Sequence, residues 1–235
     1  MASRGLLLIG VFALAAVGGA VTSAEAALIT SVGTLLSPGA SSVGPVGSNP
    51  DPNNDNALAP SANGIGVQAF FNTLEPLEIE FVAVDSAGTT EYFFSEVFTN
   101  VNTVPWIGFT FELGFRTGVN FVRVAGGSGL DFDAPNGDPV PTSSVFSVLN
   151  YQPSVLEWTT GAVNPLVGGS SGPFSVAFNF SVDVPDGLAQ LHPEGLNRFT
   201  IRETPLIASA VPEPASAALL GLGLALAALG RQKRR

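Results

Sequence analysis

The 235-residue chain has no cysteine, one histidine and only nine lysine or arginine residues. Without cysteine it has no disulfide, zinc–thiolate site, iron–sulfur cluster or cysteine nucleophile. The lone histidine, His192, excludes a metal centre built from several histidines, and any catalytic triad would depend on this one residue. We therefore expect no metal centre and assign no catalytic residue.

Basic side chains are scarce between residues 27 and 210. This part of the chain has seventeen acidic and four basic side chains, a net charge of −13. So acidic a body repels phosphate groups, which excludes nucleic acid as a partner. Cations fit the charge better, although a role in solubility explains it more simply.

No segment between residues 27 and 210 has the pattern of a helix of normal length. The chain is 46% apolar and 12% charged, with 27 glycines and 18 prolines. It is too apolar for a disordered chain and too often interrupted by glycine and proline for a helical one. Many short strands joined by turns are the natural prediction.

Apolar and polar residues alternate over residues 174–184, where phenylalanine and valine take every second position. Period two is typical of a half-buried strand, and it recurs over 109–116 and 198–202. Further strands are expected at 77–84, 91–98, 120–124, 144–150 and 155–159, separated by Gly-, Ser- and Asp-rich turns. Such spacing predicts an all-β, antiparallel, jelly-roll-like β-sandwich with the phenylalanines in its core. We place this domain at residues 65–210, after a leader or loop at 27–64 that is rich in Pro, Gly, Ser and Asn.

The first 26 residues resemble a secretory signal peptide. Arg4 is followed by an apolar run over residues 5–20 and by the small-x-small site Ala24-Glu25-Ala26. The run is short for a hydrocarbon core about 30 Å thick, which favours a cleaved signal helix over an uncut anchor. We expect signal peptidase to cut after Ala26, so that the exported protein begins at Ala27.

The C-terminal segment combines a rigid motif, an apolar run and a basic end. Residues 215–230 consist of alanine, leucine, glycine and one serine, and as a single transmembrane helix they would cover roughly 24 Å, at about 1.5 Å per residue. The basic side chains that follow stop transfer and stay on the cytoplasmic side of the inner membrane; they are Arg231, Lys233, Arg234 and Arg235.

Pro212-Glu213-Pro214 precedes this run. Proline fixes φ and keeps its predecessor out of the helical region, so the motif is extended and displays Glu213 in a rigid frame. An ordinary helix start, with Pro214 at the first helical position, explains the same residues.

The order of these three parts resembles the PEP-CTERM sorting signal of Gram-negative bacteria. The resemblance is confined to residues 211–235. It implies that the membrane enzyme exosortase recognises and removes the tail. The protein would then exist first as an inner-membrane-anchored precursor and afterwards at the cell surface or outside the cell. It also suggests a link with exopolysaccharide and biofilm matrix, and it says nothing about the chemistry of the body.

One glycine-rich segment offers oxygen ligands suited to Ca²⁺, namely Asp131, Asp133, Asn136 and Asp138. Residues 51–56 begin like an EF-hand loop, but Asn56 and Ala62 stand where the motif needs glycine and glutamate. Aspartate and asparagine also cap turns, and we prefer that interpretation at both places.

Enzymatic chemistry has little support. His192 lies in a Pro/Gly-containing loop, and we expect the histidine at the surface. Two of the many carboxylates could still meet as in a glycoside hydrolase. Glycan stacking would need exposed aromatic rings, for which Trp106 and Trp158 are candidates beside a default role in the core.

The sequence as a whole predicts a non-enzymatic, exported cell-surface or matrix protein. The alternatives are a calcium- or carbohydrate-binding, lectin-like module and a secreted glycoside hydrolase.

Overall fold

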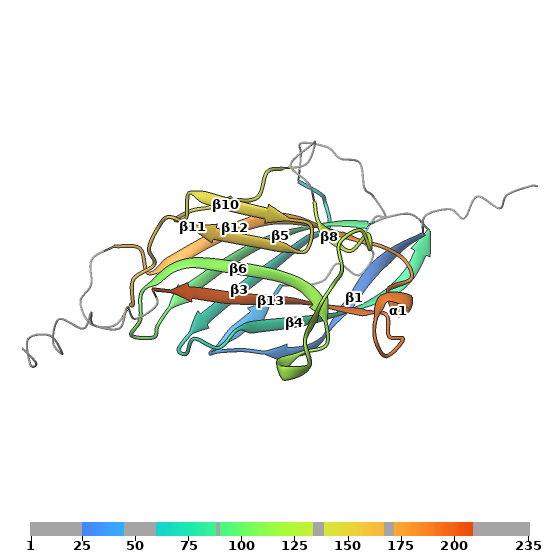
Figure 1. Cartoon of the computed structure of the whole chain (residues 1–235), viewed down its shortest axis with the longest axis horizontal. Helices are drawn as coiled ribbons and strands as arrows, with labels where there is room; N and C mark the ends of the chain where they lie inside the picture. The colour runs from blue at the N-terminus through green and yellow to red at the C-terminus, as the bar shows by residue number, and fades with distance from the viewer. Residues whose placement is uncertain (1–24, 45–59, 88–89, 134–138, 167–171, 209–235) are drawn as a thin grey trace, which may run out of the picture.

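The protein is described by a computed structural model that covers residues 25–44, 60–87, 90–133, 139–166 and 172–208. More than half of this part of the chain lies in two sheets (Figure 1). The first sheet, sheet A, consists in spatial order of β1 (Glu25–Leu36), β4 (Leu77–Ala87), β13 (Arg198–Ile207), β6 (Trp106–Phe115), β11 (Val155–Thr159) and β10 (Val148–Gln152), with β7 (Val122–Arg123) also paired to β6.

Sheet B consists of β2 (Ser41–Val43), β3 (Gly64–Phe71), β5 (Thr90–Asn100), β12 (Ser175–Val184) and β8 (Asp131–Phe132), with β9 (Thr142–Ser143) also on β12. Only two short helices occur in the described ranges, the 3₁₀ turn η1 (Gly118–Asn120) and α1 (Leu188–Leu191). The expectation of an all-β fold is confirmed.

One strand pair differs from the antiparallel arrangement expected for a jelly roll. Strand β3 runs parallel to β5, with Ile65 opposite Phe94 and Phe71 opposite Asn100. Strand β4 lies between them in sequence but belongs to the other sheet, so the chain changes sheet twice before β5 returns beside β3.

Aromatic rings join the inner faces of the two sheets. Phe111 of β6 has its ring centroid 4.9 Å from that of Phe178 and 4.9 Å from that of Phe180, both on β12. Phe81 of β4 meets Phe94 of β5 at 5.6 Å. All five side chains are fully buried or nearly so, as the alternation of apolar residues predicted.

The segment expected as a leader or loop begins with a long strand. Strand β1 pairs with β4 from Glu25 to Leu36, and the side chains of Ala27 and Ile29 are completely buried. The Ile29 N–H donates to the hydroxyl of Tyr92 at 2.7 Å. Alternation over these residues is weak in sequence because two register shifts interrupt the ladder.

A strand expected at 144–150 is divided in the structure. Strand β9 ends at Ser143 and β10 begins at Val148. Between them the Ser143 hydroxyl accepts hydrogen bonds from the N–H groups of Val145 and Phe146. This local side-chain turn takes backbone donors that a continuous strand would have paired with a neighbour.

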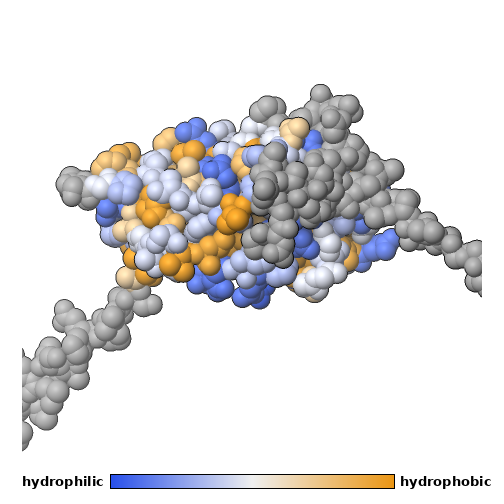
Figure 2. All heavy atoms as spheres, turned by 90° about the horizontal axis from the view of Figure 1, so that it is seen from above, coloured by the Kyte–Doolittle hydropathy of each residue, from blue (hydrophilic) through white to orange (hydrophobic). Residues whose placement is uncertain are grey.

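On the face shown in Figure 2, hydrophobic and hydrophilic residues are interspersed over the described surface. Exposed apolar side chains do occur, among them Val148, Ile107 and Val122. Such isolated residues are normal on a folded domain.

We predict that Phe178→Ala lowers the free energy of unfolding by about 3–5 kcal/mol, because it removes a ring that contacts both sheets and leaves a cavity. Phe70→Ala is the matched control, since that ring is 38% exposed, and we expect it to cost less than about 1 kcal/mol. Urea unfolding of the purified protein measures both. Equal losses in the two variants would contradict the inter-sheet role of Phe178.

Candidate functional site

A polar pocket of about 350 Å³ lies on the outer face of sheet A. Glu80 and Arg198 reach it from the sheet, because they alternate along β4 and β13 with core residues such as Phe81 and Phe199. The loop after β6 contributes Arg116, and the segment after α1 contributes His192. The other lining residues are Thr34, Thr117, Asn120, Glu194 and Leu196.

An ion pair across two strands lies at the sheet side of the pocket. Arg198 Nη1 is 3.1 Å from Glu80 Oε2, and the Thr34 hydroxyl donates to the same oxygen at 3.2 Å. Only 10% of the Glu80 side chain is exposed, against 40% of Arg198. The carboxylate is therefore positioned by β1 and β13 together.

A second ion pair holds the loop between β6 and β7. Arg202 donates from Nε to Glu78 Oε1 at 2.6 Å and from Nη2 to the Gly118 carbonyl at 2.6 Å. The Gly118 N–H donates in turn to Glu78 Oε2. The Arg202 guanidinium also lies 3.9 Å from the centre of the Phe121 ring. Two charged side chains thus hold both the N–H and the carbonyl of Gly118 in the loop.

Glycine at position 114 allows this loop to fold back on β6. A Cβ there would lie 2.5 Å from the Phe121 ring and 2.5 Å from the Val122 carbonyl oxygen. Arg116, two residues later, has φ of 63°, a conformation that is rare for a residue with a side chain. The loop thus holds Arg116 in a strained backbone conformation at the pocket, as is common at functional sites.

Arg116 and His192 each have a buried polar atom that lacks a hydrogen-bond partner. The Arg116 side chain is 3.2 Å from Glu194 through Nη2, but its Nε–H has no acceptor. His192 accepts the Glu194 N–H at Nδ1, at 3.1 Å, while its Nε2 has no partner. Because Nδ1 is an acceptor, the proton of the neutral ring is on Nε2, which is a second unsatisfied donor.

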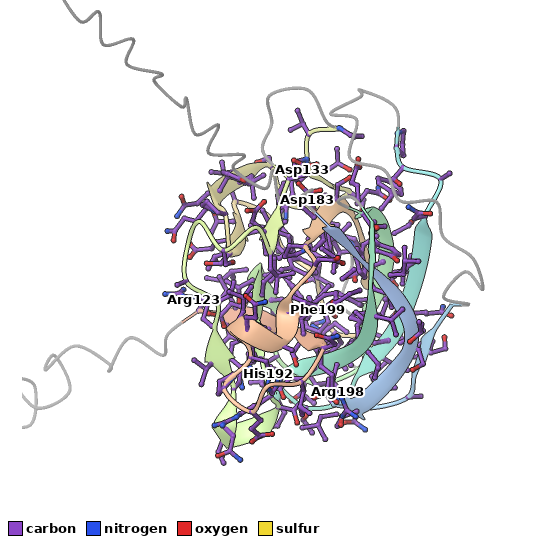
Figure 3. The ribbon with its side chains drawn as sticks, turned by 90° about the vertical axis from the view of Figure 1, so that its right-hand side faces the viewer. Arg123, Asp133, Asp183, His192, Arg198 and Phe199 are labelled. Carbon is purple, nitrogen blue, oxygen red and sulfur yellow. The ribbon has the colours of Figure 1, made fainter. Side chains whose placement is uncertain are left out.

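The burial of His192 corrects the expectation of a surface histidine. It is 5% exposed and its ring packs edge-on against Phe115, with centroids 5.3 Å apart. It caps the C-terminus of α1, where its N–H donates to the Leu188 carbonyl at 2.8 Å. Burial lowers its pKa, although the nearby carboxylates of Glu194 and Glu80 act in the opposite direction. In the view of Figure 3, His192 and Arg198 lie in the lower part of the molecule and Asp133 with Asp183 near the top.

The aspartate-rich segment considered for Ca²⁺ lies partly in the structure. Asp131 and Asp133 flank Phe132 at β8, and Asp131 pairs across the ladder with Asp183. Burial raises the pKa of Asp131. Burial, together with the nearby charges of Asp131, Asp133 and Asp183, raises the pKa of Tyr151 to about 12. Asn136, Asp138 and residues 51–56 lie outside the described residues. Among the described residues, no group of three or more His, Asp or Glu side chains has the arrangement of a metal site.

Two carboxyl groups do meet, but in the core. Glu96 of β5 and Glu203 of β13 point inward from opposite sheets and are completely buried. In the ladders Glu96 lies between Val67 and Phe178, and Glu203 lies between Leu77 and Phe111.

The contact between these carboxyls requires a proton, because two carboxylates have only acceptors. Neither has a donor from any other described side chain or backbone group. Burial raises the pKa of Glu96 to about 8 despite its hydrogen bond with Glu203. Burial and the neighbouring Glu96 charge raise the pKa of Glu203 well above its ordinary value. The pair has no exposure to solvent and hence no access for a polysaccharide.

The tryptophans considered for glycan stacking belong to the core. Trp106 is completely buried and Trp158 is 4% exposed. Trp106 contacts the rings of Phe71 and Phe109. These contacts rule out both rings as an exposed stacking platform.

The predicted targeting residues lie mostly outside the described part of the chain. Ala24, the motif Pro212, Glu213 and Pro214, residues 215–230 and the basic residues from Arg231 onward are not described. Ala26 pairs in β1 with Ser86, and Ala27, the predicted first residue after cleavage, pairs with Asp85. The helices within the described ranges are all too short to cross a membrane.

Sequence reasoning missed the pocket itself. Its residues come from four separate stretches of the sequence between Thr34 and Arg198, and no local motif joins them. One signal was present, since two of the four arginines of the body lie at the ends of apolar strand patterns and line the pocket, namely Arg116 and Arg198.

The comparisons with known proteins bear on the C-terminal tail. Residues 210–235 match the family model of the PEP-CTERM protein-sorting motif. The predicted motif is confirmed, and it implies a protein that is exported and sorted to the cell surface by exosortase. The chain matches none of the curated proteins and none of the solved structures with which it was compared. It is thus an all-β protein with a PEP-CTERM sorting signal at its C-terminus.

We predict that the protein becomes less stable as the pH rises from about 5 to about 8. Over this range an unfolded glutamate has lost the proton that the buried pair retains, so unfolding releases protons and a higher pH favours it. The slope is at most about 1.4 kcal/mol per pH unit for each proton released.

The double variant Glu96→Gln/Glu203→Gln should flatten this dependence, since two amides can pair at any pH. Glu75→Gln, at an exposed position, is the control and should keep the wild-type profile. Urea unfolding at several pH values measures the slope. A double variant with the wild-type slope would show that the pair does not carry the effect.

Proposed function

We propose that this protein is a non-enzymatic component of the bacterial cell surface or extracellular matrix, delivered by its PEP-CTERM tail and acting by display or binding. The observation that carries the proposal is the match of residues 210–235 to the sorting motif. In this proposal residues 215–230 anchor the precursor in the inner membrane, with the basic end in the cytoplasm. Exosortase then acts at the Pro212–Pro214 motif, and exopolysaccharide is the proposed matrix partner.

The boundaries of the folded domain are compatible with processing at both ends. Strand β13 ends at Ile207, before the matched segment begins at residue 210. Removal of the tail would therefore leave the described strands intact. At the other end, signal peptidase cleavage after Ala26 would keep the β1 ladder from Ala27 onward, including the buried Ile29.

The pairing and burial of the carboxyl groups support a non-enzymatic role. The pocket carboxylates, Glu80 and Glu194, are each in an ion pair with an arginine. The carboxyls of Glu96 and Glu203, which contact each other, are completely buried in the core. These arrangements suit a scaffold better than a hydrolase that needs two free carboxylates beside its substrate.

We predict that Glu213→Ala reduces the amount of protein at the cell surface severalfold and that full-length precursor accumulates in the inner-membrane fraction. The substitution removes the only charge of the rigid motif and leaves the folded domain unchanged. Glu75→Ala, an exposed glutamate of the domain, is the control and should be sorted like the wild type. Cell fractionation followed by immunoblotting with an antibody to the domain measures both. Normal surface levels of Glu213→Ala would overturn the proposed role of the motif.

A further inference from the structure

The outer pocket of sheet A has unsatisfied donors that the fold has not paired. Arg116 Nε–H and His192 Nε2–H are both buried, both belong to residues that line the pocket, and neither has an acceptor. Buried polar groups in folded proteins are nearly always hydrogen-bonded, and exceptions often mark the place of a ligand. The missing partner must supply at least two acceptor atoms.

The positions of these donors are fixed before any ligand arrives. The Glu78–Arg202 network holds the peptide of Gly118, two residues after Arg116. The His192 ring is held by the edge of Phe115 and by the Glu194 N–H at Nδ1. Both donor atoms are buried, so a ligand reaches them only when neighbouring side chains at the pocket move aside.

The charge of the pocket favours a neutral ligand over an anion. Arg116 and Arg198 are each balanced by a carboxylate, Glu194 and Glu80. An anion would have to compete with both carboxylates, and it would approach a body of net charge −13. A hydroxyl group avoids both penalties, because it accepts from arginine or histidine and donates to a carboxylate.

We propose that this pocket binds one sugar ring of an uncharged, hydroxyl-rich saccharide. Hydroxyl or ring oxygens accept from Arg116 Nε–H and His192 Nε2–H, and hydroxyl hydrogens are donated to Glu80 and Glu194. Asn120 and the threonines add further polar contacts, and Leu196 offers an apolar surface to the C–H groups of the ring. A volume of about 350 Å³ is at the lower end of small-molecule sites, which suits a single ring.

The inference rests on the proposed function, since an exported surface protein meets saccharides outside the cell. Its test is binding in vitro, which is independent of sorting. Loss of binding with normal surface delivery would count against the pocket alone, and normal binding with failed delivery would count against the proposed function alone.

The experiment titrates the purified protein with methyl glycosides of glucose, galactose, mannose and N-acetylglucosamine, and separately with glucuronate and inorganic phosphate. Saturation-transfer NMR and the shift of the arginine Nε–H resonances report binding. We expect saturable binding of at least one neutral glycoside in the millimolar range, as is usual for a single ring that makes a few hydrogen bonds. Binding of the anions alone, or of no probe up to about 100 mM, would overturn the proposal.

Two substitutions remove one donor each with little other change. Arg116→Lys keeps the charge beside Glu194 and lacks the Nε–H. His192→Asn keeps an acceptor near the position of Nδ1 and lacks the Nε2–H. Each should weaken binding about three- to tenfold, the usual effect of one hydrogen bond.

Matched controls separate the donors from the fold. Arg123→Lys makes the same change at an arginine paired with Glu112 outside the pocket, and it should bind like the wild type. His192→Gln, which places an amide N–H near the position of Nε2, should restore part of the affinity. If His192→Asn does not fold, Arg116→Lys still tests the site, because the Arg116 side chain is one-third exposed and its replacement should leave the fold intact. Unchanged affinity in Arg116→Lys would contradict the proposed site.

Discussion

The contact between the inner faces of the two sheets is the constraint on which the rest of this protein depends. The chain has no disulfide, so the sheets are held by interlocking aromatic rings such as Phe111, Phe178 and Phe180. The pleat of the strands then determines what the outer face presents. An outward charged residue directly precedes an inward ring on two adjacent strands, Glu80 before Phe81 on β4 and Arg198 before Phe199 on β13. The charged residues of the pocket therefore face outward because the neighbouring rings on the same strands face the core.

The same constraint makes the Glu96–Glu203 pair unusual. Two inward positions that the strand pattern reserves for apolar residues carry carboxyl groups, at the centre of an aromatic interior. Burying such groups is unfavourable unless they are neutral or paired, and here they satisfy each other only while a proton is shared. The stability of the sandwich is thereby tied to pH through a contact between its two sheets.

The sequence predicted most clearly the strands that have one face in the core. Period two identified residues 174–184, found as β12, and residues 109–116, most of which lie in β6. It failed where other interactions compete with the pattern. Strand β1 has register shifts, Ser143 turns the backbone, and the parallel pairing of β3 with β5 depends on the order of strands in space. His192 was expected at the surface because its burial comes from Phe115, far away in sequence.

The chain consists of a folded domain and a C-terminal tail that carries the sorting signal. The most direct test is the C-terminal mass of the protein recovered from the surface of the native cell. We predict a mature protein that has lost the apolar run and the basic end, with its C-terminus at or near the Pro212–Pro214 motif and every described strand retained. Surface protein that still extends to Arg235 would contradict processing of this tail by exosortase.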